Sequence, residues 1–281
     1  MGIKIVWAES VFILSAILLA VVLYSRIWLR PSRLRSLSIR LCISAFGILI
    51  PFLGLELYAF HFLAQSDSFG FTLASRRWSE LYWNPINSMG FRDVEHHPDA
   101  MGARKVLLLL GDSLVAGMGT SDYRKRFANV LQSRLGEEWE VVILARNGWD
   151  TNDELNALKS SPFKPSSIAL SYYINDIEGA AHKRGVDRPT LIQSPAPWVG
   201  LFVNHSYVLN FLYWRVYRFR NASELGRIYT DYVTRCYSDE AIWKTHEEEL
   251  KEIADFAERQ TAPLHVLVIP RLTDKIGRAH V

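Results

Sequence analysis

Three polar positions, each just beyond an apolar run, carry residue types that could perform acyl transfer: Ser113, Gly148 and Asn175. A serine hydroxyl becomes a nucleophile when a base removes its proton, and amide N–H groups stabilise the oxyanion that its attack creates. Glycine has no side chain, so its backbone N–H can closely approach a substrate oxygen. An asparagine side chain supplies a further N–H donor. These residues therefore predict a nucleophile, Ser113, with Gly148 and Asn175 as oxyanion donors.

Each of the three also has an ordinary structural interpretation. Serine often caps a helix, and glycine and asparagine often form turns. Two neighbouring acids are expected to play structural roles inside the site. Asp112 is expected to accept backbone N–H bonds in the turn before Ser113, and Asp176 is expected to be a loop residue. The agreement of three strand ends favours the catalytic interpretation.

The positions of these residues depend on elements that the hydrophobic pattern predicts. Four apolar runs are predicted strands: 105–110, 139–144, 166–174 and 264–269. Three helices are predicted between them: one starting near Ser121, one opened by a capping box at 151–154 with Asp150 as a cap or loop residue, and one over about 239–260. Apolar runs that alternate with helices predict a parallel sheet covered on both faces, an α/β fold. In such sheets active groups collect beyond the carboxyl ends of the strands.

Three blocks of this sequence resemble the GDSL, or SGNH, hydrolase family. Residues 111–114 read Gly-Asp-Ser-Leu, residues 147–151 are similar to the second block, and Asn175-Asp176 matches the third. The resemblance covers about 105 to 270. It implies a three-layer α/β/α, flavodoxin-like fold with a mostly parallel sheet and no metal or organic cofactor. It also implies Ser113 as nucleophile, with the Ser113 N–H, the Gly148 N–H and the Asn175 side chain as the oxyanion hole.

The sequence departs from the family pattern in two blocks and lacks the fourth. Tyr173 stands where the third block has glycine, and Ile143 and Ala145 stand where the second block has asparagine and glycine. The fourth block, Asp-x-x-His, carries the catalytic base, and nothing after Ser113 matches it. Residues 93–96, Asp-Val-Glu-His, have the spacing but precede the nucleophile, so we expect no catalytic role for them.

Two further histidines are poorly placed to act as the base. His182 lies just past the third block, and His265 lies within a predicted strand. Residues 276–281 read as one frame of a common short-read sequencing adapter, so we expect them to be a non-native tail. The natural chain is then expected to continue past about Lys275 and to carry the base there. Without that base, the chain as given is expected to have little or no activity.

Two apolar segments before the α/β region predict a membrane anchor. Residues 5–25 and 41–63 are each long enough to cross a bilayer core of about 30 Å. The connection between them is rich in arginine, which predicts that this loop is cytoplasmic. The rest of the chain is then expected on the other side of the membrane, which in a bacterium is the periplasm. Glu56 and His61 stand near a span end and are expected at the interface. The expected compartment is therefore the bacterial inner membrane with a periplasmic catalytic domain.

These observations give a domain plan and limit the classes of partner. The plan has four parts: 1–63 is the anchor with two transmembrane helices, 64–103 a linker or docked arm, 104–275 the hydrolase domain, incomplete at its C-terminus, and 276–281 the tail. The net charge of +3 owes much to the cytoplasmic arginines and does not indicate nucleic acid binding. Cys42 and Cys236 are not expected to form a disulfide.

The aromatic and arginine-rich segment 185–237 is an expected insert before the last strand, with a helix over 204–220. It could cover an acyl pocket, lie on the membrane surface or pack into the core. The predicted function is a serine esterase acting on an acylated small molecule, lipid or glycan. Two alternatives remain open: an O-acyltransferase acting on envelope polysaccharide, and a non-catalytic binding protein on the same fold.

Overall fold

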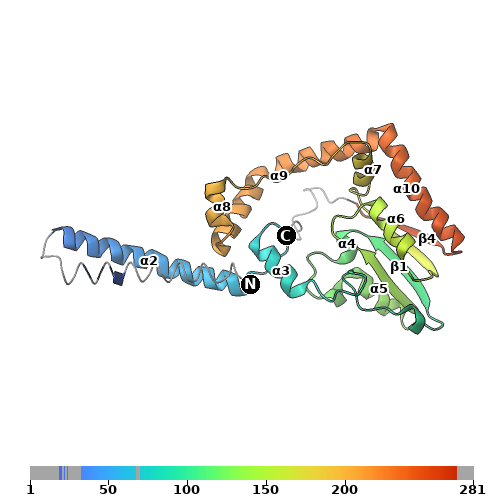
Figure 1. Ribbon diagram of the computed structural model, residues 1–281, viewed down its shortest axis with the longest axis horizontal. Helices are drawn as coiled ribbons and strands as arrows, with labels where there is room; N and C mark the ends of the chain where they lie inside the picture. Colours follow the sequence, from blue (N-terminus) through green and yellow to red (C-terminus); the bar gives the residue numbers. More distant parts are fainter. Residues whose placement is uncertain (1–18, 21, 23, 25–32, 68–69, 271–281) are drawn as a thin grey trace. The chain divides into compact units, whose positions relative to one another are not determined.

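The computed structural model describes residues 19–20, 22, 24, 33–67 and 70–270 (Figure 1). The chain divides into two compact units. The helical unit contains residues up to Arg77 together with Gln193–Arg220. The sheet unit contains Trp78–Ile192 and the chain from Asn221 onward. The candidate chemistry lies entirely in the sheet unit.

The sheet unit is built on four parallel strands, as the sequence predicts. The strands are β1 (Lys105–Gly111), β2 (Trp139–Ala145), β3 (Ser167–Tyr172) and β4 (Leu264–Val268). Their order in the sheet is β2-β1-β3-β4, and every neighbouring pair is parallel. Because β1 pairs with both β2 and β3, three of the four strands release their following loops side by side at one edge.

Helices cover both faces of this sheet, which gives three layers (Figure 1). The first face packs on α6 (Thr151–Ser160) and α10 (Glu240–Arg259). The second face packs on α4 (Ser113–Ala116) and α5 (Phe127–Leu135). Successive β1 side chains point to opposite faces of the sheet and pack into the two hydrophobic cores there. Leu108 and Leu110 face α6 and α10, while Leu107 and Leu109 face α4 and α5. This alternation explains why β1 must be apolar throughout.

Strand β4 differs from the other three because the side chains after Leu264 are exposed. Val266, Leu267 and Val268 are 54%, 52% and 65% exposed. Consecutive strand residues point to opposite faces. Both faces of the last part of β4 are therefore uncovered within the described residues, although the sequence predicts a buried strand there.

Two helix starts differ from their predicted positions. The helix expected near Ser121 begins at Phe127, and the residues directly after β1 form the short helix α4 instead. The N-cap of α6 is Asp150, whose carboxylate accepts from the N–H groups of Asn152 and Asp153 at 2.9 and 3.3 Å. The predicted capping box at 151–154 is therefore wrong by one residue, and the expected capping role of Asp150 is confirmed.

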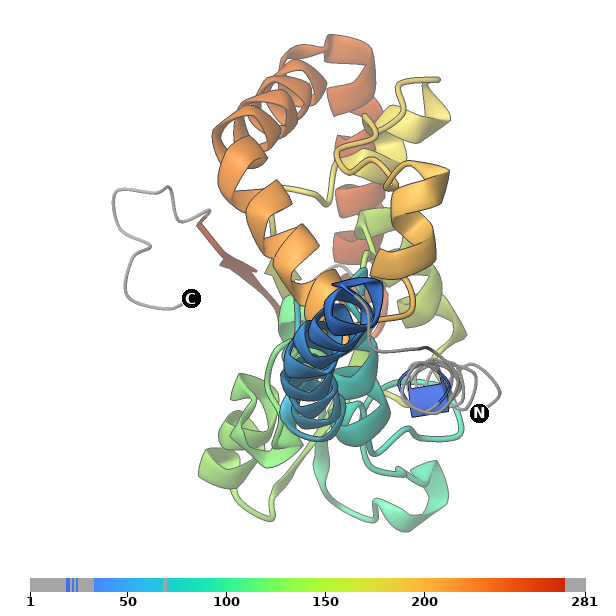
Figure 2. The ribbon, with the colours of Figure 1, turned by 90° about the vertical axis from the view of Figure 1, so that its left-hand side faces the viewer.

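Among its described residues, the helical unit contains one helix with the length and composition of a membrane span. Helix α2 (Arg33–Phe62) includes the candidate span Ile39–Phe62, of 24 residues. It matches the second predicted span. The first, 5–25, lies outside the described residues except for four positions, so the expectation of two spans is not confirmed. The same unit contains α8 (Pro197–Val203), the first half of α3 (Leu73–Tyr82) and the first part of α9 (Tyr207–Ser238) (Figure 2).

The remaining short elements belong to the sheet unit. They are α7 (Glu178–Lys183), η1 (Pro98–Ala100) and η2 (Tyr123–Lys125). The segment 185–237 is largely helical, and its predicted helix over 204–220 is the first part of the longer α9. Both Cys42 and Cys236 are buried free thiols, as expected.

Candidate active site

The ends of β1, β2 and β3 bring the three sequence blocks to one edge of the sheet. In register, Gly111 of β1 pairs with Ala145 of β2, and Leu110 of β1 pairs with Leu170 of β3. The loop after β3 contacts the loop after β2, because the Asn175 side-chain amide donates to the Trp149 carbonyl at 3.0 Å. The three loops therefore leave neighbouring strands of one sheet in the same direction.

Ser113 is the first residue of α4, immediately after β1. Asp112 is its N-cap and accepts from the Leu114 N–H at 2.8 Å, which confirms the expected bracing role. Gly111 allows this tight turn, because a Cβ at that position would lie 2.2 Å from a Val115 methyl carbon and 3.2 Å from the Ser171 Cβ. Ser113 itself is half-buried.

Two backbone amides near this turn have unused hydrogen-bonding capacity. Gly148 is exposed and has a φ of +78°, a conformation that favours glycine over any residue with a side chain. Across residues 70–270, neither the Gly148 N–H nor the Ser113 N–H donates to an acceptor. Free N–H groups at the surface of a turn are what an oxyanion hole requires.

Asp176 holds the loop after β3 in place. It is fully buried and accepts from the Tyr173 N–H at 2.8 Å, which matches the loop role expected for it. Its carbonyl accepts from the Thr151 N–H at 3.3 Å, so the loop after β3 is joined to the start of α6. Asn175, one residue earlier, is half-buried and uses only one of its two amide hydrogens on Trp149.

Beneath these loops lies a buried carboxyl, Glu154, whose role the sequence did not reveal. Glu154 is 0% exposed, and neither of its oxygens has a hydrogen-bond partner among the described residues. Burial and the nearby charges of Asp176 and Asp112 raise its pKa far above the ordinary value. Burial also raises the pKa of Asp176, but that carboxylate keeps an N–H donor. Among these neighbouring carboxyls we therefore assign the bound proton to Glu154, so that its side chain is neutral at neutral pH.

An arginine from the arm before β1 fixes the loop that follows Ser113. The Arg92 guanidinium is 1% exposed and donates to four backbone carbonyls. Three belong to the segment after Ser113: Ala116 at 3.2 Å, Gly117 at 2.6 Å and Thr120 at 2.8 Å. Arg92 also lies over the rings of Trp78 and Trp83, at 5.7 and 4.8 Å from their centroids. Nothing in the sequence pattern indicated this brace.

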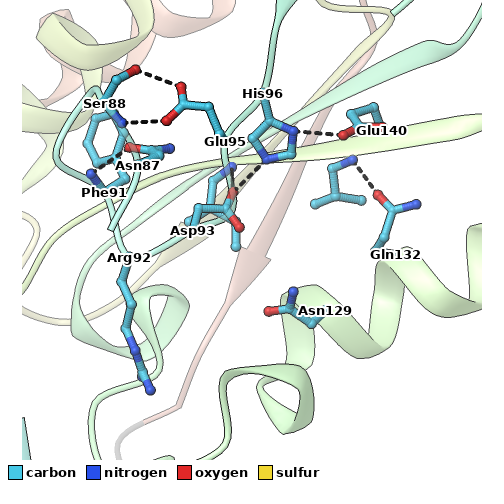
Figure 3. Close-up of polar contacts among 12 residues, drawn as sticks. Asn87, Ser88, Phe91, Arg92, Asp93, Glu95, His96, Asn129, Gln132 and Glu140 are labelled. Carbon is cyan, nitrogen blue, oxygen red and sulfur yellow. Dashed lines mark hydrogen bonds and ion pairs between the residues drawn. The ribbon is translucent and has the colours of Figure 1, made fainter. Parts of the chain in front are cut away.

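The Asp-x-x-His pair at 93–96 is structural (Figure 3). The two ring nitrogens of His96 lie 3.0 Å from an Asp93 oxygen and 2.7 Å from a Glu140 oxygen. Burial disfavours the imidazolium, but the bonds and charges of Asp93 and Glu140 outweigh it and raise the pKa of His96. Asp93 also accepts from the Ile143 N–H at 3.1 Å and from Arg126 at 3.0 Å.

The position of His96, near the start of β1 and β2, separates it from the candidate site. Its partner Glu140 pairs in register with Val106, near the start of β1, whereas Ser113 follows the end of β1. The five steps along the strand from Val106 to Gly111 span about 16 Å. His96 therefore ties the arm to the opposite end of the strands, in agreement with the non-catalytic role expected of it.

Three other described histidines do not supply an evident base. His182 is 78% exposed and pairs with Asp187 at 2.6 Å, and His265 lies on the exposed strand β4. His246 of α10 is fully buried and bonds the Tyr172 hydroxyl at 2.8 Å. None of these three is hydrogen-bonded to the turn at Ser113 within the described residues. Residues 271–281, which include the expected tail, lie outside the described residues.

Comparisons with known proteins add little to this geometry. No protein-family model and no curated protein matches the chain. One solved crystal structure is similar at 17% sequence identity, over 58% of this chain and 83% of its own length. Its TM-score is 0.24, which is too low to support a conclusion about fold or function.

Proposed function

We propose that this chain is a membrane-anchored serine hydrolase of the GDSL/SGNH type, acting on ester-linked acyl groups. The observation that carries the proposal is the convergence of three neighbouring strand ends. They place Ser113, Gly148 and Asn175 on adjoining loops, with two unused amide donors among them. The strand order β2-β1-β3-β4 is also the beginning of the flavodoxin-like order, in which ligands bind where the order reverses between the first and third strands.

In the proposed reaction, the Ser113 hydroxyl attacks the ester carbonyl, and the resulting oxyanion is held by N–H donors. The donors are the Ser113 and Gly148 backbone amides and the second hydrogen of the Asn175 side chain. Each donor of this kind contributes about 10²–10³ in rate. A histidine beyond the described residues is the proposed base, since His96 lies at the opposite end of the strands and neither His182 nor His246 has a hydrogen bond to the turn at Ser113. Asp112, Asp176 and Arg92 hold the loops that carry the reacting groups.

The anchor belongs to the same proposal. Helix α2 has the length to cross a bilayer, and the arginine-rich sequence before it favours a cytoplasmic loop with the sheet unit outside. An enzyme held at the outer face of a bacterial inner membrane would meet acylated envelope lipids and glycans. We propose those as the substrate class.

The decisive experiment compares the 281-residue chain with the natural chain read through its downstream reading frame. Each is purified in detergent and assayed with a chromogenic short-chain ester, together with Ser113→Ala and a matched control, Ser121→Ala, on the exposed loop that follows. The natural chain should turn over the ester in a Ser113-dependent manner, and the 281-residue chain should show little turnover.

Two results would contradict this proposal in different ways. Ser113-dependent turnover by the 281-residue chain would show that the base lies within it. A natural chain that carries Asp-x-x-His yet shows no Ser113-dependent turnover would overturn the hydrolase proposal, and transfer of the acyl group to an added glycan would identify an acyltransferase instead.

A further inference from the structure

Helix α8 exposes an apolar face that the proposed hydrolase chemistry does not use. Its seven residues, PWVGLFV, carry no charge. Trp198, Leu201 and Phe202 are 70%, 64% and 53% exposed. Positions i, i+3 and i+4 lie on one side of a helix, so the three side chains form a single face. Three large apolar side chains together on one short exposed helix indicate an interaction surface.

The end of α8 is tied to helix α2 through a carboxylate. Glu56 of α2 accepts from the Ser206 hydroxyl at 2.8 Å, from the Val208 N–H at 3.1 Å and from the Tyr207 N–H. These groups form the N-terminus of α9, three residues after α8 ends. A carboxylate at a helix N-terminus satisfies its free N–H groups and favours its dipole. Glu56, expected at the interface from its sequence position, is therefore the link between α2 and the α8–α9 corner.

Further contacts make this corner rigid. The Asn210 side chain donates to the Val203 carbonyl at 2.9 Å and accepts from the Leu73 N–H at 2.9 Å. The ring of Phe60 in α2 packs edge-on against Tyr207, with centroids 5.4 Å apart. The apolar face of α8 is thus held at a fixed position relative to the last turns of α2.

That position corresponds to the end of the candidate span. Glu56 lies six residues before the end of α2 at Phe62, which is about 9 Å along the helix axis. The neighbouring α2 side chains Leu57, Tyr58 and Phe62 are 51%, 63% and 72% exposed. In a bilayer these exposed side chains face lipid, and the C-terminal end of α8 lies close to them, because Ser206, three residues after α8 ends, bonds Glu56.

The first part of α9 continues the same pattern. Leu212, Val216 and Phe219 are 50%, 49% and 88% exposed and follow i, i+4, i+7 spacing. Exposed Arg215 and Arg220 flank this apolar stripe on its two sides. An apolar stripe bordered by arginines is typical of helices that lie in the plane of a membrane interface with anionic headgroups.

We propose that α8 and the first part of α9 lie in the interface of the bilayer that α2 crosses, with Trp198, Leu201 and Phe202 in the lipid. This inference rests on the proposed anchoring by α2 and specifies a second, non-spanning contact with the membrane. The occupant of the apolar face is lipid because Glu56 holds that face beside the lipid-facing end of α2. Arg215 and Arg220 contact anionic headgroups.

The test uses the full chain in nanodiscs of phosphatidylcholine and phosphatidylglycerol, with Cys42 and Cys236 replaced by alanine. Single nitroxide labels are placed at Phe202→Cys in α8, at Ile48→Cys as the lipid reference in α2, and at Glu137→Cys as the aqueous reference in the sheet unit. Collision with oxygen, which concentrates in lipid, is compared with collision with a water-soluble nickel chelate. We expect position 202 to resemble position 48, with high oxygen and low nickel accessibility.

Failure of this inference is distinguishable from failure of the anchoring itself. If position 48 is lipid-exposed and position 202 resembles position 137, α2 is in the membrane and the interfacial role of α8 is wrong. If position 48 is also water-exposed, the anchoring and the inference fall together. In discs of phosphatidylcholine alone, the label at 202 should become more accessible to nickel, and an unchanged value would contradict the role of the two arginines.

Discussion

Replacing Glu154 by glutamine tests the buried carboxyl beneath the candidate site. The side chain is fully buried, its oxygens lack partners in the described residues, and its pKa is raised by burial and by the charges of Asp176 and Asp112. Glutamine has nearly the same shape, is neutral at every pH, and can donate hydrogen bonds to neighbouring carboxylates. We expect Glu154→Gln to stabilise the protein near neutral pH and to have much less effect in mild acid.

The size of the effect follows from proton linkage. In the unfolded chain a glutamate ionises near pH ~4.3, so above that pH the folded state must hold a proton that the unfolded state releases. Each pH unit between the two pKa values then lowers the free energy of unfolding by about 1.4 kcal/mol. Glutamine removes this dependence. The difference in unfolding free energy between variant and parent should therefore change by about 2–3 kcal/mol between pH 5 and pH 7.

The measurement is urea denaturation of the full chain in detergent, followed by tryptophan fluorescence at pH 5, 6 and 7. The matched control is Glu248→Gln in α10, where the carboxylate is exposed and the substitution should leave the pH dependence unchanged. A difference between Glu154→Gln and the parent that is the same at all three pH values would refute the assignment of a proton to Glu154.

Three further substitutions test the arm and the α2 link. Asp93→Asn breaks the buried ion pair with Arg126 and should lower the free energy of unfolding, measured by urea denaturation, by about 3–5 kcal/mol. Asp99→Asn, at an exposed residue of the same arm, should have little effect, and similar losses for the two variants would contradict the structural role of Asp93. Because the folded pKa of His96 is raised, its stabilisation is present below pH ~6.5 and lost as pH rises through the folded pKa, so His96→Gln should destabilise more at pH 5.5 than at pH 9. Glu56→Gln should weaken the α9 cap by about 1–2 kcal/mol and speed amide exchange at 206–209 in nanodiscs; Glu248→Gln should not.

The sheet could be predicted from the sequence because its strands are apolar on both faces. Such runs are short, and glycine or polar residues end them, so local information defines them well. The predicted N-cap of α6 was one residue too late, because Asp150 and Thr151 are both good cap residues and only the backbone conformation decides between them. The exposure of β4 could not be predicted, since a run of valine and leucine reads the same whether or not a helix covers it.

The candidate site was predictable in its blocks but not in its supports. Ser113, Gly148 and Asn175 each follow a strand, and the parallel sheet brings their loops together. Glu154 and Arg92 gave no local signal. Arg92 bonds carbonyls 24 to 28 residues later in the chain, at Ala116, Gly117 and Thr120. Carbonyl acceptors exist at every residue, so no side-chain pattern marks a partner of this kind.

The bare strand β4 has a practical consequence for anyone who isolates the sheet unit. Within the described residues it is bonded to β3 alone, and valine and leucine side chains face solvent on both of its sides. An uncovered apolar border strand is a template on which another copy can add its own strand. Protein prepared in this form would therefore tend to associate through β4 and to precipitate on concentration, and a lysine at position 267 would make it easier to handle.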